Sequence, residues 1–533
     1  MSFSASSQER KNMILVTADQ MQEMDKTTIE SFGIPGCVLM ENAGRGAVDF
    51  LLKKFKDIRP QKIAVMAGRG NNGGDGFVMA RYLMEKKFDV TVFLLSLKNK
   101  VKGDAKLNMD FAQKLCDRSR TSSIIEIPDA DAFEKQKNQM RHHDLFIDAI
   151  LGTGLNSDVK GIFKDAIELM NASLKPVFSI DIPSGLDSDT GQPLGVAVKA
   201  DATATFAFAK AGHILFPGNT FTGELSVIDI GIPDFIAQEK NIALFLIEKN
   251  DITACFTPRE FQSHKGSFGH VLVIAGSAGK TGAAALCANA AMRCGTGLVT
   301  LGVAKSLNTS IESLVIEPMT HPLPEKDKGC LSDTCFDEIQ SLLTGKQALA
   351  MGPGLGTRKG TKKLVENLIL QTRVPMIIDA DAINCIAGNS KILKKKKAPA
   401  ILTPHPGEMA GLCGMTTSDV QADRIGIASS FAKTHDCILI LKGAQTVVSL
   451  PNGRSYICPT GNPGMASGGM GDVLTGMIAG FCAQGFTPEN ASLAGVYIHG
   501  LCADILSCDM GAFGFVATDM IQMIPKTIHQ YLL

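Results

Sequence analysis

Apolar, strand-like runs alternate with longer amphipathic runs along almost the whole chain, and this alternation restricts the fold more than any other feature. In the first half the strand-like runs are KIAVMAG, DVTVFLLS, HDLFIDAILG, PVFSIDIPSG and ADATATFAF. Before them, TADQMQEMDKTTIESFG predicts a helix with Thr17 as its N-cap and Gly33 as its stop. Strands that alternate with helices form βαβ units around a parallel sheet. The sequence therefore predicts an α/β fold.

The alternation ends near SVIDIGIP, resumes at HVLVIAGS, and continues through GLVTLGVA, ALAMGPG, PMIIDADA, AILTPHPGE and CILILKG. The stretch between them, LFLIEKNDITACFTPREFQSHKGSFG, is irregular and resembles a linker. A chain of 533 residues is also too long for a single core. We therefore expect two domains, over residues 10–240 and 250–531, with a boundary near residue 245.

The composition excludes several classes of partner. Lys and Arg number 53 and so do Asp and Glu, so no long-range field favours nucleic acid or an anionic membrane. The 14 cysteines are scattered without a C-x-x-C pair, as expected of free thiols in a reducing cytoplasm. No signal-length apolar core and no run of about 18 apolar residues is evident. We expect a soluble, cytoplasmic protein.

Three glycine-rich turns with oxygen-bearing side chains follow strand-like runs in the first half. GRGNNGGDG at 68–76 has the spacing G-x-G-x-x-G, FIDAILGTGL carries Asp148, and SIDIPSGLDSDTG carries Asp181 and Ser184. Each turn alone is equally compatible with a tight connection or a helix cap. Because ligands of open α/β sheets collect outside the carboxyl ends of the strands, three such turns together favour a binding site.

This ordered set, GRGNNGGDG, DAILGTGL and DIPSGLDSDTG, resembles the NAD(P)H-hydrate epimerase domain, a Rossmann-like, three-layer fold. The family interconverts the two epimers of hydrated NADH or NADPH. The resemblance implies a potassium ion held by Asn72, Asp148 and Ser184, and Asp181 matches the acidic residue that contacts the substrate, which we take as the catalytic residue. The implied substrate contacts are Asn71, Asn72, Gly73, Gly74, Asp75, Gly152, Thr153, Gly154, Leu155, Asn156, Ser157, Asp158 and Asp181.

The implied chemistry suits a carboxylate at this position. The ring-nitrogen lone pair expels the neighbouring hydroxyl, giving an iminium-like cation or an opened ring, and the hydroxyl returns to either face. Asp181 would shuttle the proton and stabilise the cation.

In the second half the strongest candidate site is GNPGMASGGMGDVLTGMIAGF at 461–481. Gly468, Gly469 and Gly471 precede an apolar run of helical length, so free amides and the positive end of a helix dipole face any ligand there. One interpretation makes Asp472 a cap and the glycines packing residues. The other makes the turn an anion site for a transferring phosphoryl group, with Asp472 as the base toward an acceptor hydroxyl.

The segment IAGSAGKT at 274–281 nearly matches the nucleotide loop G-x-x-x-x-G-K-[ST]. Ile274 stands where that loop needs its first glycine. We therefore interpret the segment as a substrate-facing connection between a strand and a helix.

The second half resembles the ribokinase-like NAD(P)H-hydrate dehydratase family, a three-layer α/β/α fold, in HKGSFGHVLVIAGS, GPGLG, DADAIN, TPHPGE, KGAQT and GGMGD. The resemblance implies that Asp472 is catalytic and contacts the hydrated nucleotide together with Ala283, Gly354 and His405. The implied contacts to ADP are Lys442, Gly443, Ala444, Gln445, Thr446 and Gly471. Gln445 stands where the family usually has glycine and Met470 where it usually has threonine, so both departures concern the nucleotide side.

Together the two resemblances imply a bifunctional repair enzyme for the hydrates NADHX and NADPHX. It would epimerise their R and S forms and dehydrate the S form at the expense of ADP or ATP with Mg²⁺, while K⁺ serves the epimerase; we also expect a homo-oligomer. One alternative is a sugar or vitamin kinase with an accessory Rossmann-like domain, which would release a stable phosphorylated product. Another makes the first half a binding module, which predicts loss of polar residues that Asn72, Asp148, Asp181 and Ser184 retain.

Overall fold

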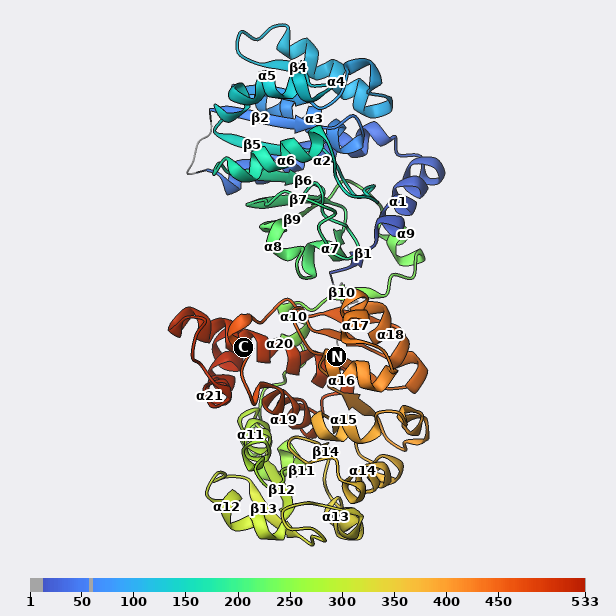
Figure 1. Ribbon diagram of the computed structural model, residues 1–533, viewed down its shortest axis with the longest axis vertical. Coiled ribbons are helices and arrows are strands. Elements are labelled where there is room, and N and C mark those ends of the chain that lie inside the picture. The colour runs from blue at the N-terminus through green and yellow to red at the C-terminus, as the bar shows by residue number, and fades with distance from the viewer. Residues whose placement is uncertain (1–12, 57–60, 533) are drawn as a thin grey trace, which may run out of the picture. The chain divides into compact units, whose positions relative to one another are not determined.

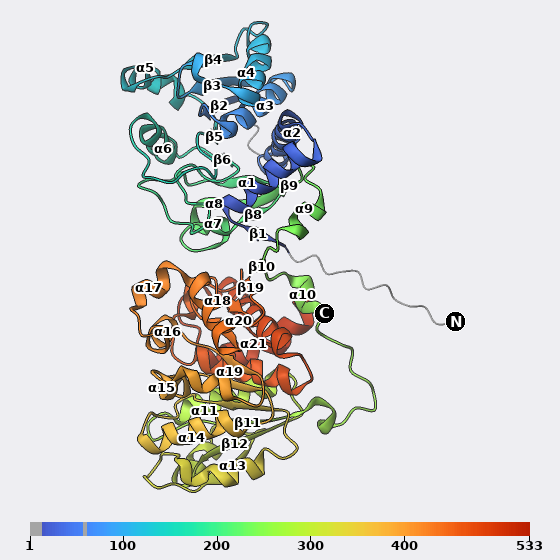
Figure 2. The same ribbon diagram turned by 90° about the vertical axis from the view of Figure 1, so that its right-hand side faces the viewer.

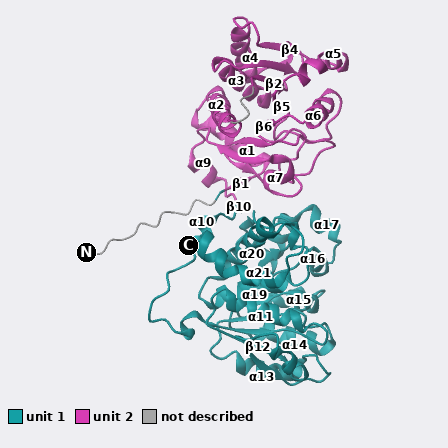
Figure 3. Ribbon diagram, turned by 90° about the vertical axis from the view of Figure 1, so that its left-hand side faces the viewer, with its two compact units in different colours: residues 1–13, 243–533 teal, residues 14–242 magenta. Residues whose placement is uncertain are grey.

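A computed structural model describes residues 13–56 and 61–532 of the chain. The chain divides into two compact units, Ile14–Ile242 and the chain from Ala243 onward (Figure 3). Both units are α/β structures whose sheets are wholly or mainly parallel, as the alternation of strand-like and helical runs predicts.

The first unit contains a seven-stranded, fully parallel sheet (Figures 1 and 2). From β2 the chain adds β3 and β4 on one side, and then returns to the other side of β2 to add β5, β6, β7 and β9. This is the doubly wound arrangement of Rossmann-like folds. The switch point therefore lies between β2 and β5. In spatial order the strands are β4 (Ser123–Glu126), β3 (Asp89–Leu94), β2 (Lys62–Ala67), β5 (Leu145–Ala149), β6 (Val177–Ile180), β7 (Ala202–Phe206) and β9 (Glu224–Ile228).

Helices cover both faces of this sheet because successive strand side chains point to opposite sides. In β2, Ile63 and Val65 pack in one buried cluster, whereas Ala64 and Met66 pack in the other. The first cluster includes helices α2 (Gly36–Lys54), α3 (Asn71–Glu85) and α4 (Gly103–Cys116), and the second includes α5 (Ala130–Arg141) and α6 (Ile162–Ala172). Shorter helices are α7 (Ala211–Ile214), α8 (Asn219–Thr222) and α9 (Asp234–Glu239).

The predicted N-terminal helix is confirmed, with a change of winding inside it. Thr17 caps α1 (Ala18–Lys26), a π-helical turn continues over Thr27–Phe32, and Gly33 ends it with φ +93°. Before it, β1 (Leu15–Val16) pairs in parallel with β8 (Ala209–Lys210) in a separate two-stranded sheet. This pairing fixes where α1 begins.

The second unit contains a ten-stranded sheet that is parallel except at β18, which runs antiparallel to both neighbours. In spatial order the strands are β10 (Leu244–Leu246), β19 (Ser455–Ile457), β18 (Val447–Ser449), β17 (Ile438–Leu441), β16 (Ala400–Leu402), β15 (Met376–Ile378), β14 (Ala348–Met351), β11 (His270–Ile274), β12 (Leu298–Ala304) and β13 (Met319–Leu323). The segment interpreted as a linker is thus partly ordered: it supplies edge strand β10 and helix α10 (Lys249–Thr253).

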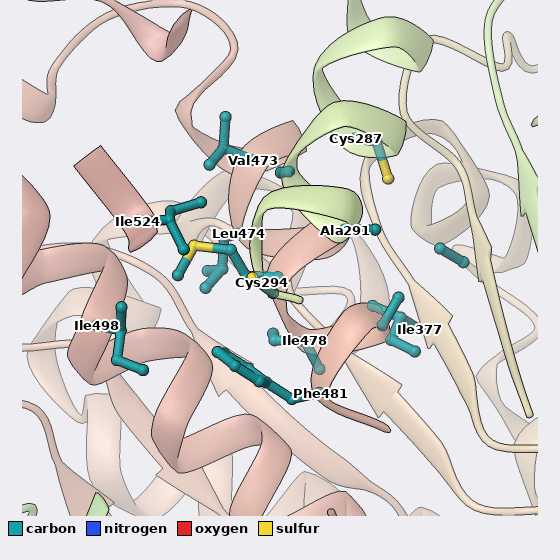
Figure 4. Packing of buried hydrophobic residues seen from close by; sticks show 14 of the residues in the cluster. Cys287, Ala291, Cys294, Ile377, Val473, Leu474, Ile478, Phe481, Ile498 and Ile524 are labelled. Carbon is teal, nitrogen blue, oxygen red and sulfur yellow. The ribbon is translucent and has the colours of Figure 1, made fainter. Parts of the chain in front are cut away.

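Two buried clusters on opposite faces make this unit three-layered. Val271 and Val273 of β11 pack with α11 (Thr281–Arg293), α19 (Met470–Ala483), α20 (Pro488–Met510) and α21 (Ala517–Thr527), and Figure 4 shows Phe481 and Ile498 in this core. Leu272 of β11 packs in the other cluster, with α13 (Phe336–Leu342), α14 (Lys359–Gln371), α15 (Ala380–Ile386), α16 (Pro406–Cys413), α17 (Thr417–Ala422) and α18 (Arg424–His435). A short helix, α12 (Asn308–Glu312), follows β12.

One helix differs from the expectation that no segment reaches membrane-spanning length. Among the described residues α20 is long and apolar enough by composition, but 72% of its apolar window is buried inside the unit. A helix apolar on all sides is typical of a protein core, and α20 lies in one.

Candidate active sites

A cavity of about 660 Å³ opens at the carboxyl ends of the strands in the first unit. The turns after β2 and β5, on either side of the switch point, form part of its wall. The predicted site residues that line it are Asn71, Asn72, Asp75, Gly152, Thr153, Gly154, Leu155, Asn156 and Asp181. Four predicted substrate contacts, Gly73, Gly74, Ser157 and Asp158, are not in this lining.

The glycines of GRGNNGGDG serve two different purposes. A Cβ on Gly68 would lie 2.1 Å from the Ile150 carbonyl oxygen, and one on Gly73 would lie 2.0 Å from the Gly68 carbonyl oxygen. Gly68 therefore lets the turns after β2 and β5 pack closely, and Gly73 lets the start of α3 pack against Gly68. Gly70 faces open space and is the N-cap of α3, so the first amides of that helix remain available for an anion.

Asp181 forms a buried ion pair with Lys210. The Lys210 Nζ donates to Asp181 Oδ1 at 2.7 Å and to Thr205 Oγ1 at 2.9 Å, and its side chain is 1% exposed. Burial would raise the pKa of Asp181, but the Lys210 charge and hydrogen bond outweigh it and lower that pKa. Asp181 is therefore a carboxylate near neutral pH, and its φ of +65° marks a constrained strand end.

His213 fixes the backbone around this pair. Its Nδ1 accepts from the Lys210 amide at 3.0 Å, so the neutral ring carries its proton on Nε2, which donates to the Asp181 carbonyl oxygen at 2.9 Å. Burial lowers the pKa of His213 to about 4. The imidazole therefore stays neutral and positions both partners.

Two further carboxyl groups face the same cavity. Asp75 on α3 is 8% exposed, and burial, reinforced by the charge of Asp181, raises its pKa well above the ordinary value. Asp25 on α1 also lines the cavity; burial raises its pKa to about 6, with Lys210 opposing the shift and Asp181 adding to it. The site thus holds three carboxyl groups around one ammonium group.

The three predicted potassium ligands come together around the backbone of Leu151. Asn72 Nδ2 donates to the Leu151 carbonyl oxygen at 2.9 Å, and Ser184 Oγ lies 3.1 Å from the same oxygen. Ser184 Oγ also donates to Asp148 Oδ1 at 2.5 Å. Asn72 Oδ1 is buried and has no hydrogen-bond partner within the described chain, so one acceptor oxygen is left for a cation.

Sequence reasoning missed Lys210, His213 and Asp25. A signal existed for the lysine, because it is the single charged residue within the apolar run ATFAFAKAG. Asp25 had no such signal, since it lies in an amphipathic helix among several acidic and basic residues.

In the second unit a lysine again lies among carboxylates at strand ends. Lys442, directly after β17, pairs with Asp379 at 2.8 Å and lies 3.8 Å from Glu408. Thr475 of α19 donates to the other Asp379 oxygen at 2.7 Å. Burial would lower the pKa of Lys442, but Asp379 and Glu408 outweigh it and raise that pKa. Lys442 was predicted, whereas its partner Asp379 and the Thr475 hydroxyl that donates to Asp379 were not.

Asp472 lies in the first turn of α19, beside this cluster. Burial, together with the charge of Asp379, raises its pKa to about 7, against the opposing charge of Lys442. A Cβ on the neighbouring Gly471 would lie 3.3 Å from Lys442 Nζ. The glycine turn, the lysine and Asp472 therefore share one locality, and Asp472 is poised to take up or release a proton near neutral pH.

The predicted substrate contacts occupy neighbouring turns. A Cβ on Gly354, where φ is +60°, would lie 3.2 Å from Ala283 Cβ, so the turn after β14 touches the start of α11. The segment IAGSAGKT forms the predicted strand-to-helix connection, from β11 to α11. His405 caps α16: its Nδ1 accepts from the Gly407 and Glu408 amides, while its side chain stays 57% exposed.

The loop Lys442–Thr446 is exposed at Gly443 and Ala444, and it closes on itself through Thr446 Oγ1, which donates to the Gly443 carbonyl oxygen at 3.2 Å. Ala444 is exposed at its tip. Gln445 adopts φ +48°, a left-handed conformation that favours glycine, and its Oε1 is buried without a partner in the described chain. Met470, the other departure, packs into the core under α19.

Comparison with known proteins identifies two families along the chain. A family described as YjeF-related protein N-terminus matches residues 36–212, and one described as NAD(P)H-hydrate dehydratase matches residues 271–526. A bifunctional NAD(P)H-hydrate repair enzyme of Moorella thermoacetica is 38% identical, covering 97% of both chains. The enzyme of that name from Escherichia coli is 31% identical over 96% of this chain and 93% of its own.

Two solved structures are similar to about half of this chain. An ADP/ATP-dependent NAD(P)H-hydrate dehydratase from Bacillus subtilis, co-crystallised with ATP and Mg²⁺, is 30% identical, covers 53% of this chain and 96% of its own, and has a TM-score of 0.45. A ribokinase-like superfamily protein from Enterococcus faecalis is 24% identical, covers 54% of this chain and 96% of its own, and has a TM-score of 0.47.

Proposed function

Because the chain belongs to the family of bifunctional NAD(P)H-hydrate repair enzymes, we propose that each unit carries one activity of that family, at the sites described above. The protein is an epimerase and a dehydratase of hydrated NADH and NADPH. The unit Ile14–Ile242 interconverts the R and S epimers. The unit from Ala243 onward dehydrates the S epimer, consuming ADP or ATP and giving NAD(P)H, AMP or ADP, and phosphate. Full-length repair-enzyme relatives favour this function over the kinase alternative.

The observation that carries the epimerase assignment is the Asp181–Lys210 pair inside a dinucleotide-sized cavity. The open amides at the start of α3, beside Gly70, suit the pyrophosphate of the substrate. The nicotinamide ring then reaches Asp181, whose carboxylate stabilises the cation formed when the hydroxyl leaves. Lys210 keeps that carboxylate ionised, and His213 holds its backbone.

The first unit also suits a potassium ion. Asn72 Oδ1 lacks a partner within the described chain, and Ser184 Oγ and the Leu151 carbonyl oxygen lie beside it in the same hydrogen-bonded group. Neutral oxygens beside the charged Asp148 match the needs of a hard monovalent cation. When bound, the ion would supply positive charge near the substrate. Potassium chloride should raise the melting temperature of the unchanged protein more than sodium chloride does, and Asn72→Ala should abolish the difference.

In the second unit we assign Asp472 as the base and the α19 N-terminus as the phosphoryl site. Asp472 takes the proton of the ring hydroxyl as the hydroxyl oxygen bonds to the terminal phosphorus of the nucleotide. The bond from that phosphorus to the bridging oxygen breaks, and its electron pair leaves with AMP or ADP. The amides around Gly471 and the Lys442 ammonium offset the charge that develops there. Phosphate then leaves with the carbon–oxygen bonding pair, and loss of a proton from the adjacent ring carbon restores the dihydronicotinamide.

Mg²⁺ fits this site as a companion of the nucleotide. Within the described residues no group of three or more His, Cys, Asp or Glu side chains is arranged to hold a metal, and both Asp379 oxygens are already hydrogen-bonded. Mg²⁺ commonly binds through one or two carboxylates together with substrate phosphates. It would supply charge neutralisation to the phosphates when bound.

The direct test of the function incubates the purified protein with both epimers of hydrated NADH, ADP and Mg²⁺ and follows NADH absorbance. The assignment predicts recovery of nearly all the hydrate as NADH and a requirement for nucleotide and Mg²⁺, with release of one phosphate for each NADH. A stable phosphorylated product without NADH would support a kinase instead.

We also propose a reducing, cytoplasmic compartment. All 14 cysteines are free thiols, and most are buried. Burial raises the pKa of several of them, for example to about 12 at Cys482 and at Cys437, so these thiols are unreactive packing residues. Alkylation of extracted protein should find reduced cysteines throughout, whereas recovery of stable disulfides would argue against this location.

A further inference from the structure

The carboxyl group of Asp25 faces the epimerase cavity from an element that supplies none of the residues predicted from the sequence. Helix α1 lies beyond the strand ends of the seven-stranded sheet, as Figures 1 and 2 show, and it contributes Met21, Gln22 and Asp25 to the lining. Among the described residues the Asp25 carboxyl has no hydrogen-bond partner. Its oxygens are therefore free to meet a ligand.

The start of α1 is tied to the strand that ends at the active-site lysine. Val16 pairs with Lys210 in the register of β1 and β8. Thr17 and Gln20 form a capping box at the first turn of α1, and the Ala18 amide donates to Asp189 Oδ1 at 2.7 Å. Asp25 is consequently held in the neighbourhood of Lys210 by backbone pairing.

Charge balance in the cavity leaves a surplus of carboxyl groups. Among the carboxyl groups of the cavity Lys210 donates to Asp181 alone, and no hydrogen bond or ion pair joins Asp25 or Asp75 to a cation within the described residues. Interacting buried carboxylates cannot all ionise at low cost, so one of them retains a proton. Burial raises the pKa of Asp25 to about 6, whereas that of Asp75 is raised further, so the proton of Asp25 is exchanged more readily than that of Asp75. The other charged side chains in the lining are Arg69 and Asp104.

Epimerisation needs proton transfer on two faces of one ring. The hydroxyl leaves one face with a proton, and water must lose a proton as it adds to the other. Asp181 and Asp25 come from different elements, the end of β6 and helix α1. Resting on the epimerase assignment above, we propose that Asp25 is the second proton-transfer group of the reaction and works with Asp181 on a ring bound between them.

The step balances without any further reactant. Protonated Asp25 gives its proton to the ring hydroxyl. The carbon–oxygen bond then breaks, and the electron pair of that bond leaves with water, while the nitrogen lone pair forms the C=N bond. A water molecule then adds to the opposite face, the C=N pair returns to nitrogen, and Asp181 accepts the released proton. Asp25 is partly exposed, so solvent restores its proton before the next turnover, and Asp181, whose pKa is lowered by Lys210, passes the proton that it accepted back to water.

The test follows conversion of the pure R epimer to the S epimer by chromatography, without nucleotide, so that the dehydratase is silent. Asp25→Asn should lower kcat by about 100-fold with little change in KM, the effect expected on losing a general acid or base. It should also remove the decline in rate that the unchanged protein shows as pH rises through about 6. Asp25→Glu should recover part of the rate.

Asp19→Asn is the matched control, because Asp19 is exposed on the same helix and lies outside the cavity lining. Dehydration of the S epimer by each preparation, with its melting curve, reports whether the variants fold. An Asp25→Asn protein with the rate and pH profile of Asp19→Asn would overturn the proposal while leaving the epimerase assignment intact. Absence of epimerisation by the unchanged protein would overturn both.

Discussion

Each of the two units places one lysine among several carboxyl groups, but the surroundings of the two lysines differ. In the first, Lys210 faces Asp181, Asp75 and Asp25 inside a cavity. In the second, Lys442 pairs with Asp379 and lies near Glu408 and Asp472, at the N-terminus of a long helix. Each arrangement leaves a carboxyl group that titrates near neutrality, which is how one chain obtains both acids and bases at a single pH.

The difference lies in what balances the remaining negative charge. The Lys210 ammonium near Asp25 is already paired with Asp181, so there a proton supplies the balance. Around Asp472 the glycine amides and the positive end of the α19 dipole balance the negative charge, and the same groups can bind a phosphate group. The comparison therefore assigns proton donation to the first site and hydroxyl activation to the second.

The largest expected effect comes from removing the base of the second site. Asp472→Asn should lower the dehydratase rate by about 10³-fold, because the ring hydroxyl then has no proton acceptor. The epimerase rate should be unchanged, since Asp472 belongs to the other unit. Separate assays of phosphate release and of epimer interconversion check this, and equal losses in both would break the assignment of one activity to each unit.

Removing the lysine of the first site should damage stability as well as activity. Lys210→Met leaves Asp181 buried without its cation, which costs about 3 kcal/mol. Because the pKa of Asp181 is lowered by its partner, this stabilisation is present at neutral pH and is lost as Asp181 becomes protonated in acid. The difference in unfolding free energy should therefore shrink as the pH falls. Lys175→Met, at an exposed lysine, is the control and should change little.

The two activities should also differ in their pH profiles. The dehydratase kcat/KM should rise as Asp472 loses its proton and should level off above pH about 7. Asp379→Asn removes a charge that raises the pKa of Asp472 and frees the Lys442 ammonium to lower that pKa. The rise of kcat/KM with pH should therefore move to lower pH. If kcat/KM of that variant rises over the same pH range as in the unchanged protein, a group other than Asp472 sets the pH profile.

The smallest effect concerns the nucleotide loop. Gln445→Gly places glycine at a left-handed backbone position and removes a buried side-chain oxygen that has no partner in the described chain. It should stabilise the protein by about 1 kcal/mol. Its KM for ADP should change, because the loop is the proposed nucleotide contact. Lys87→Gly, at a residue with φ +71° in the other unit, should alter stability alone. Equal KM values for ADP in both variants would show that Gln445 does not contribute to nucleotide binding.

Much of this arrangement is predictable from the sequence, because local patterns encode it. Strand ends, glycine turns and the positions of Asp181 and Asp472 follow from apolar runs broken by short polar residues. Lys210 lies 29 residues from Asp181 and Lys442 lies 63 residues from Asp379, so these pairs depend on tertiary packing. Strands β18 and β19 were also missed, because they follow β17 without intervening helices and so fall outside the alternation of strands and helices. Strand β10 was missed because it lies in the segment interpreted as a linker.

The most direct test of the account uses pure R hydrate with ADP and Mg²⁺ and two variants, Asp181→Ala and Asp472→Asn. Each alone should give NADH slowly or not at all, whereas an equimolar mixture should recover much of the rate of the unchanged protein. Rapid NADH formation by either variant alone, or none by the mixture, would contradict two separable sites that act in succession.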